Sequence, residues 1–82
     1  MSKAILYVRK EDPGSILIVN QKGGLRKLYC PFRVVCIRRI RSIQKYTSVY
    51  VEEVLINNKE ELVYVIQGMP YPYHHFIVVI SF

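Results

Sequence analysis

Residues 48–67, with the sequence SVYVEEVLINNKEELVYVIQ, decide the fold. Two runs rich in valine, isoleucine and tyrosine, residues 48–56 and 61–67, flank the polar segment Asn57-Asn58-Lys59-Glu60. β-Branched and aromatic side chains fit a pleated sheet, and an asparagine pair tolerates the left-handed backbone conformations of a tight turn. The stretch therefore predicts a β-hairpin.

The composition of the whole chain favours the same class of structure. Its 82 residues include eleven Val, ten Ile and seven Tyr but only one Ala, the best helix former. Further strands are expected at residues 3–9, 15–20, 32–40 and 76–81, while residues 25–31 are ambiguous and residues 68–72 should interrupt the pattern. We therefore predict one all-β domain over residues 1–82, in which residues 1–31 contain an N-terminal hairpin.

The second half of the chain carries four short motifs: Arg33-Val34-Val35-Cys36-Ile37, Val49-Tyr50-Val51-Glu52-Glu53-Val54, Val63-Tyr64-Val65-Ile66 and Tyr71-Pro72-Tyr73-His74-His75-Phe76. In this order they resemble small bacterial and phage-encoded proteins with an Src-homology-3-like (SH3-like) barrel, over about residues 33–79. The resemblance implies a small SH3-like barrel of five or six antiparallel strands. Most members of that group have no assigned activity, so it also implies binding rather than catalysis.

Several expected strands are apolar on both faces. In residues 15–20, for example, Ile16 and Ile18 alternate with Leu17 and Val19. Neighbouring strand residues point to opposite faces, and one small barrel has a single interior. The second set of side chains must meet water, a covering segment or another chain. A homodimer, or a structural subunit of a phage or mobile-element assembly, would cover them.

Positive charge is sorted along the chain. The net charge is +6, and residues 13–51 contain eight cations but no carboxylate. The six acidic residues lie outside that segment, as the pairs Glu11–Asp12, Glu52–Glu53 and Glu60–Glu61. Concentrated positive charge attracts anions such as nucleic acid or an acidic protein surface.

The basic residues of one strand end and the loop after it are the first candidate site. Arginine binds phosphate through its fork of donors, and tyrosine offers a surface on which bases stack. Nucleic acid is the first-choice ligand and an acidic protein the second. A third interpretation is that these charges only keep apolar strands soluble. The candidate residues are Arg33, Arg38, Arg39, Arg41, Lys45, Tyr46 and Tyr50.

The aromatic turn before the last strand is the second candidate. Tyr71, Tyr73 and His74 could form part of a groove for a proline-rich peptide. The alternative is a tight turn that plugs the end of the barrel, with Tyr71 and Phe76 in the core. The basic character of the loop at residues 41–47 argues against a groove for basic peptides.

Catalytic and metal-binding patterns are lacking. Cys30 and Cys36 are too far apart along an extended segment for a disulfide, so free thiols are expected, with Cys36 buried. The adjacent His74 and His75 do not match zinc spacing, and no phosphate-binding glycine loop occurs. We therefore expect no enzyme, metal, cofactor or small-molecule substrate.

The hydrophobic segments are short. The longest purely apolar run covers residues 76–80, whereas a membrane-spanning helix needs about 20 apolar residues. The N-terminal residues also lack a signal-peptide pattern. These features predict a cytoplasmic protein without membrane contact.

Overall fold

The part of the chain that the structure describes contains nine strands and one short 3-10 helix, joined by turns and loops. The computed structural model describes residues 5–12 and 14–80, so the expected strand ends at Lys3 and Ser81 lie outside the described residues. All strand pairs are antiparallel, and they form three sheets of three strands each. The all-β class predicted from the composition is confirmed.

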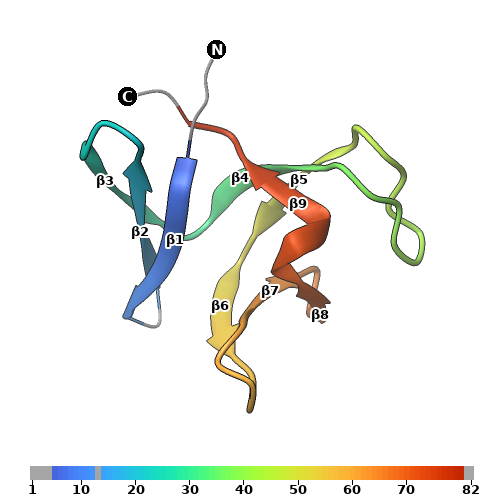
Figure 1. Ribbon diagram of the computed structural model, residues 1–82. Helices are drawn as coiled ribbons and strands as arrows, with labels where there is room; N and C mark the ends of the chain where they lie inside the picture. Colours follow the sequence, from blue (N-terminus) through green and yellow to red (C-terminus); the bar gives the residue numbers. More distant parts are fainter. Residues whose placement is uncertain (1–4, 13, 81–82) are drawn as a thin grey trace.

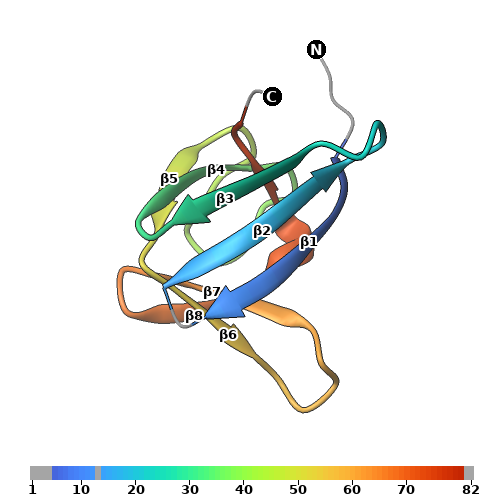
Figure 2. The same cartoon turned by 90° about the vertical axis from the view of Figure 1, so that its left-hand side faces the viewer.

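The first sheet has the order β1-β2-β3, formed by β1 (Ile5–Asp12), β2 (Ser15–Asn20) and β3 (Leu25–Tyr29). The ambiguous segment 25–31 thus supplies a third strand, at the edge of the sheet, and the N-terminal unit is larger than the expected hairpin. The sheet lies across the rest of the molecule, and Figure 2 shows one of its faces without any covering element.

The second sheet has the order β5-β4-β9, from β4 (Phe32–Cys36), β5 (Ser48–Val51) and β9 (Phe76–Val78). The expected strand 32–40 ends early, at Cys36, because the chain turns into a loop in which Arg41 and Tyr46 have positive φ angles of 50° and 73°. β9 brings the end of the chain back beside β4 (Figure 1).

The third sheet has the order β6-β7-β8, from β6 (Glu53–Ile56), β7 (Leu62–Ile66) and β8 (Met69–Pro72). The hairpin predicted from residues 48–67 is confirmed for β6 and β7. The left-handed residue of its turn is Glu60, with φ of 62°, whereas Asn57 accepts backbone hydrogen bonds from Lys59 and Glu61. The asparagine therefore caps the turn through its side chain.

Two expectations for this region are wrong. Residues 48–56 are two strands, because the chain leaves β4 at Val51 and joins β7 through the Glu52 N–H, which donates to the Val65 carbonyl at 2.8 Å. Residues 69–72, expected to interrupt the pattern, form β8. Its prolines are tolerated because an edge strand needs hydrogen bonds on one side only.

The 3-10 helix η1 (Tyr73–His75) connects β8 to β9. No individual sheet closes on itself among the described strands, so the closed barrel of five or six strands is not confirmed; nine strands occur there where six were expected. Within the described residues, no helix has the length and apolar character needed to cross a membrane.

One core joins the three sheets. Aromatic rings occupy its centre: the Tyr64 ring meets Phe32 edge-on with centroids 5.8 Å apart, and Tyr71 meets Phe76 in the same way at 6.0 Å. Ile16 and Ile18 of β2 belong to the same buried cluster. The inner face of the first sheet therefore covers the interior formed by the other two.

Both cysteines are free thiols, and Cys36 is fully buried, as predicted. The Cys36 thiol donates to the Arg38 carbonyl at 3.1 Å. Partial burial raises the pKa of the Cys30 thiol. The raised pKa favours the unreactive thiol form of Cys30.

Candidate nucleic-acid interface

The loop of residues 37–47 connects β4 to β5 and projects from one end of their sheet (Figure 1). Its base is closed by two hydrogen bonds between Cys36 and the segment Tyr46–Thr47, at 2.6 and 2.8 Å. Further along, Ile40 and Ile43 exchange a pair of backbone hydrogen bonds, and the Ile43 side chain is buried. The loop is therefore anchored, while its charged side chains remain exposed.

The cations of this region have no carboxylate partner within residues 5–12 and 14–80. Arg38, Arg39, Arg41 and Lys45 are exposed, as is Arg33 on β4, and none of them forms an ion pair with a described residue. By contrast, Arg9 and Lys27 of the first sheet are paired with Glu11 and Asp12. Five cations without an ion pair to a described residue thus lie at the loop and the neighbouring sheet, while Lys10, Lys22 and Lys59, which also lack one, are scattered over other elements.

Arg41 differs from the other three cations of the loop. Its guanidinium donates to the Pro70 carbonyl at 2.8 Å and lies over the ring of Tyr71, 4.6 Å from the centroid. Arg41 therefore ties the loop to β8, in addition to presenting charge. The sequence analysis missed this role because it expected no strand at residues 69–72.

Replacing Arg41 with alanine should therefore lower stability. We expect a loss of about 1–2 kcal/mol, from one cation–π contact and one hydrogen bond. The matched variant Arg39→Ala removes an exposed cation for which the structure shows no such contact, and it should change stability by less than about 0.5 kcal/mol. Urea denaturation followed by circular dichroism measures both. Equal midpoints would contradict the anchoring role of Arg41.

The outer face of the β5-β4-β9 sheet extends the basic surface. Arg33 and Tyr50 are directly opposite each other on β4 and β5, and Arg33 donates to the Ser48 hydroxyl at 3.2 Å. Tyr50 is 59 % exposed and Tyr46 is 75 % exposed. The Lys45 ammonium lies 5.0 Å from the centre of the Tyr46 ring. The two tyrosines proposed for stacking are thus accessible beside cations.

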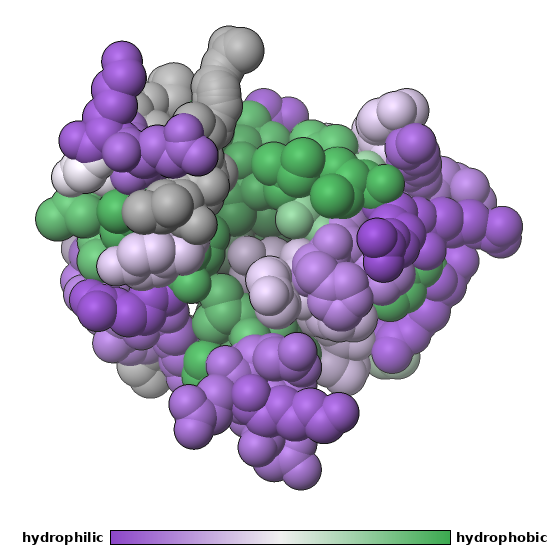
Figure 3. Space-filling view, viewed as in Figure 1, coloured by the Kyte–Doolittle hydropathy of each residue, from purple (hydrophilic) through white to green (hydrophobic). Residues whose placement is uncertain are grey.

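Aliphatic side chains on the same face escaped the sequence analysis. Ile77 of β9 pairs with Val35 and is 49 % exposed, and Val79 is exposed just beyond the strand. Figure 3 shows a band of apolar surface over β9, next to the hydrophilic side chains of the loop. The strand pattern of residues 76–79 could have revealed these exposed side chains. The buried residues Phe76 and Val78 alternate with Ile77 and Val79, which are exposed.

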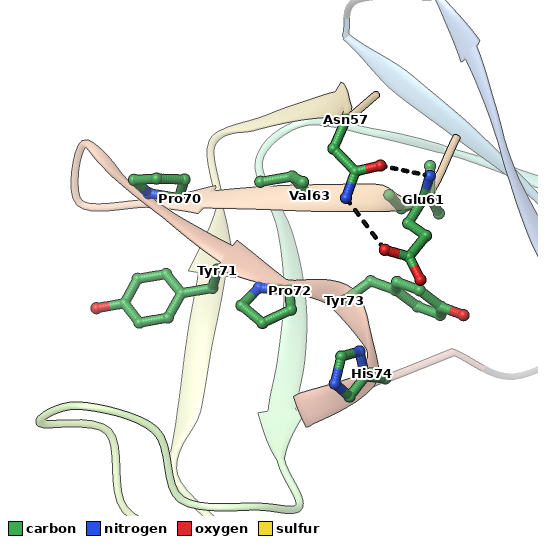
Figure 4. Close-up of a pocket in the computed structure, with 9 residues that line it drawn as sticks. Asn57, Glu61, Val63, Pro70, Tyr71, Pro72, Tyr73 and His74 are labelled. Atoms are coloured by element: carbon green, nitrogen blue, oxygen red, sulfur yellow. Dashed lines mark hydrogen bonds between the residues drawn. The ribbon is translucent and has the colours of Figure 1, made fainter. Parts of the chain in front are cut away.

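The three residues of the predicted peptide groove line one hollow. Tyr71, Tyr73 and His74 surround a space of about 250 Å³ together with Pro70, Pro72 and the hairpin residues Asn57 and Glu61 (Figure 4). Tyr71 and Phe76 are also buried in the core, as the plug interpretation expected. The turn therefore contributes Tyr71 and Phe76 to the core. Tyr73 and His74, together with Tyr71, border the hollow.

The described residues contain no cluster of three or more histidine, cysteine or acidic side chains able to hold a metal ion. Comparisons with protein-family models, with curated proteins and with solved structures find no match to this chain. The geometry itself is therefore the basis for a functional assignment.

Proposed function

We propose that this protein is a small non-catalytic binding module that binds nucleic acid through the basic loop of residues 37–47 and the outer face of the β5-β4-β9 sheet. The observation that carries the proposal is the gathering of five cations without carboxylate partners among the described residues, beside two exposed tyrosines. Unpaired cations attract phosphates from a distance. When they contact phosphates, the nucleic acid releases its bound counterions, and this release favours binding. The residues of this basic interface are Arg33, Arg38, Arg39, Arg41, Lys45, Tyr46 and Tyr50.

The residues of the proposed interface have three different roles. Arg33, Arg38, Arg39 and Lys45 contact phosphates, because their charged groups are not engaged with carboxylates of the described chain. Arg41 holds the loop in position and presents the remaining donors of its fork. Tyr46 and Tyr50 provide faces on which unpaired bases stack, which favours single strands over duplex.

We also propose that residues 32–78 form an SH3-like barrel. The proposal is supported by the path of the chain: β5 and β6 run as one bent strand from the second sheet into the third, and η1 leads into β9, which returns to β4. The buried residues of these two sheets form one shared interior. In this arrangement the first sheet is an addition that covers the interior from one side.

Fluorescence anisotropy with labelled single-stranded and duplex oligonucleotides tests the nucleic-acid proposal. About four phosphate contacts on a single strand predict that the logarithm of the association constant falls with the logarithm of salt concentration with a slope of about −3. Binding should tolerate changes of base sequence. No binding at low salt would reject the proposal and leave an acidic protein as the ligand of the basic interface.

A homodimer is the second candidate function, and the uncovered face of the first sheet favours it. Ile16 and Ile18 face the core, so the half-buried Leu17 lies on the opposite face; Val19 is itself buried, although it lies outside the core cluster. Val19 is directly opposite Leu25 of β3, which is 62 % exposed. Figure 2 shows this face toward the viewer, with no other element across it.

Charge on this face is balanced. Arg9 and Lys27 flank Leu17 on the neighbouring strands, and each is paired with a carboxylate, Arg9 with Glu11 at 3.0 Å and Lys27 with Asp12 at 3.7 Å. A second copy could therefore approach this face without local repulsion, although the whole chain carries +6. An isologous contact, in which the face meets itself, satisfies both copies.

Sedimentation equilibrium tests the dimer. Salt should strengthen it, because salt screens the repulsion between two +6 chains and leaves the apolar contact intact. Leu25→Lys should give a monomer, whereas Leu55→Lys, an equal change at an exposed leucine of β6, should not. A wild-type monomer up to about 200 μM would reject the proposal; this limit corresponds to a free energy of association of about −5 kcal/mol.

A further inference from the structure

A groove with aromatic walls and two carboxylates lies between the first sheet and the end of the core. It has a volume of about 450 Å³ and is bordered by β1, the hairpin between β6 and β7, and the segment from η1 to β9. This volume is within the range of small-molecule sites, about 300–1,000 Å³. The groove shares Glu61, Leu62, Tyr73 and His74 with the smaller hollow of Figure 4.

The walls and floor of this groove present aromatic rings. Tyr7 and Tyr73 border it and are 49 % and 39 % exposed, while the buried Tyr64 and Phe76 lie at its floor. The Tyr73 ring is held edge-on against His74, with centroids 5.7 Å apart. Burial also raises the pKa of Tyr64, so its hydroxyl stays neutral. Aromatic side chains of this kind exclude water from a ligand, and the negative faces of aromatic rings attract cations.

The charge of the groove is opposite to that of the protein. Glu60 and Glu61 line it, and neither is paired with a cation of the described chain. Asn57 donates to one carboxylate oxygen of Glu61 at 3.1 Å, which orients this carboxylate at the edge of the groove. In a chain with a net charge of +6, two such carboxylates beside aromatic rings are a site for a cation.

We propose that this groove binds a methylated ammonium group. A bare ammonium is strongly hydrated and loses that water at a high cost in an aromatic groove. A methylated ammonium keeps its charge, presents apolar surface to the rings and is attracted by the carboxylates. Both a free quaternary amine and a methylated lysine side chain carry this group. The groove lining includes Ile77 at the edge of the β5-β4-β9 sheet but none of the seven residues of the basic interface, so the proposal does not rest on nucleic-acid binding.

Two-dimensional ¹⁵N–¹H NMR with the full chain tests the proposal. Choline is added to about 50 mM and compared with 3,3-dimethylbutanol, which has the same shape without charge. We expect choline to shift the amides of Tyr7, Glu61 and Tyr73 with saturation, and to bind at least about ten-fold more tightly than the neutral alcohol. A peptide with one trimethyl-lysine, compared with its unmodified form, shows which source binds more tightly.

Charge-matched variants locate the site. Glu60→Gln with Glu61→Gln should weaken choline binding about ten-fold and leave the alcohol unaffected, since the amide oxygen that Glu61→Gln introduces can still accept from Asn57. Glu52→Gln with Glu53→Gln removes the same charge outside the groove and should change nothing. Equal binding of choline and the alcohol, equal effects of the two double variants, shifts confined to other residues or the absence of saturable shifts would each overturn the proposal.

Discussion

Reversing Arg38 and Arg39 to glutamate is expected to weaken binding of single-stranded oligonucleotides roughly 25-fold at about 0.1 M salt. Each phosphate contact on a single strand contributes a salt slope of about −0.7, so the loss of two contacts removes about 1.4 logarithmic units at that salt concentration. The salt dependence should become weaker, with the slope changing from about −3 to about −1.5. Affinity should fall by a similar factor for different base sequences, because phosphate contacts carry no sequence information.

The control for this experiment is a double reversal elsewhere. Lys22→Glu with Lys59→Glu changes the net charge by the same amount, and both lysines are exposed in turns outside the basic interface. This variant should retain most of the affinity and most of the slope. Both variants should unfold at the wild-type urea concentration within error, since exposed charges contribute little to stability. Equal losses of affinity would show that only the overall charge matters.

Replacing Tyr64 with alanine should cause the largest loss of stability in the chain. Its side chain is 2 % exposed and packs against Phe32 and Phe76, with ring centroids 5.8 and 6.2 Å away. Removal of a buried aromatic ring usually costs about 3–5 kcal/mol, from lost burial and the cavity that remains. Small domains have a total stability of only about 5–15 kcal/mol, so much of the protein should unfold at elevated temperature.

Urea denaturation with far-ultraviolet circular dichroism measures this loss. Tyr64→Phe keeps the ring and removes only the hydroxyl, so it should cost far less than the alanine variant. Tyr50→Ala removes an equal ring from an exposed position and should change stability by about 0.5 kcal/mol or less. A loss below about 1 kcal/mol for Tyr64→Ala would mean that the ring is not central to the core.

Local preference explains which features the sequence could predict. The valine- and isoleucine-rich runs form strands, and the hairpin at residues 53–66 occurs as expected, because β-propensity and turn chemistry act over a few residues. The strand β8 was missed because it contains two prolines, and proline in a sequence argues against a central strand. Only the neighbouring strand β7, which provides hydrogen bonds on one side, makes this segment extended.

The sequence by itself determined the all-β class, the free thiols and the sorting of charge, since these follow from the identity and order of residues. Tertiary structure decided which groups meet. It placed Arg41 over Tyr71, separated the outer face of β2 from the core, and brought Tyr7, Glu61 and Tyr73 to one groove. Such contacts join residues distant in the chain, and a strand pattern does not specify which sheets lie side by side. The packing of three sheets around one core supplies that information.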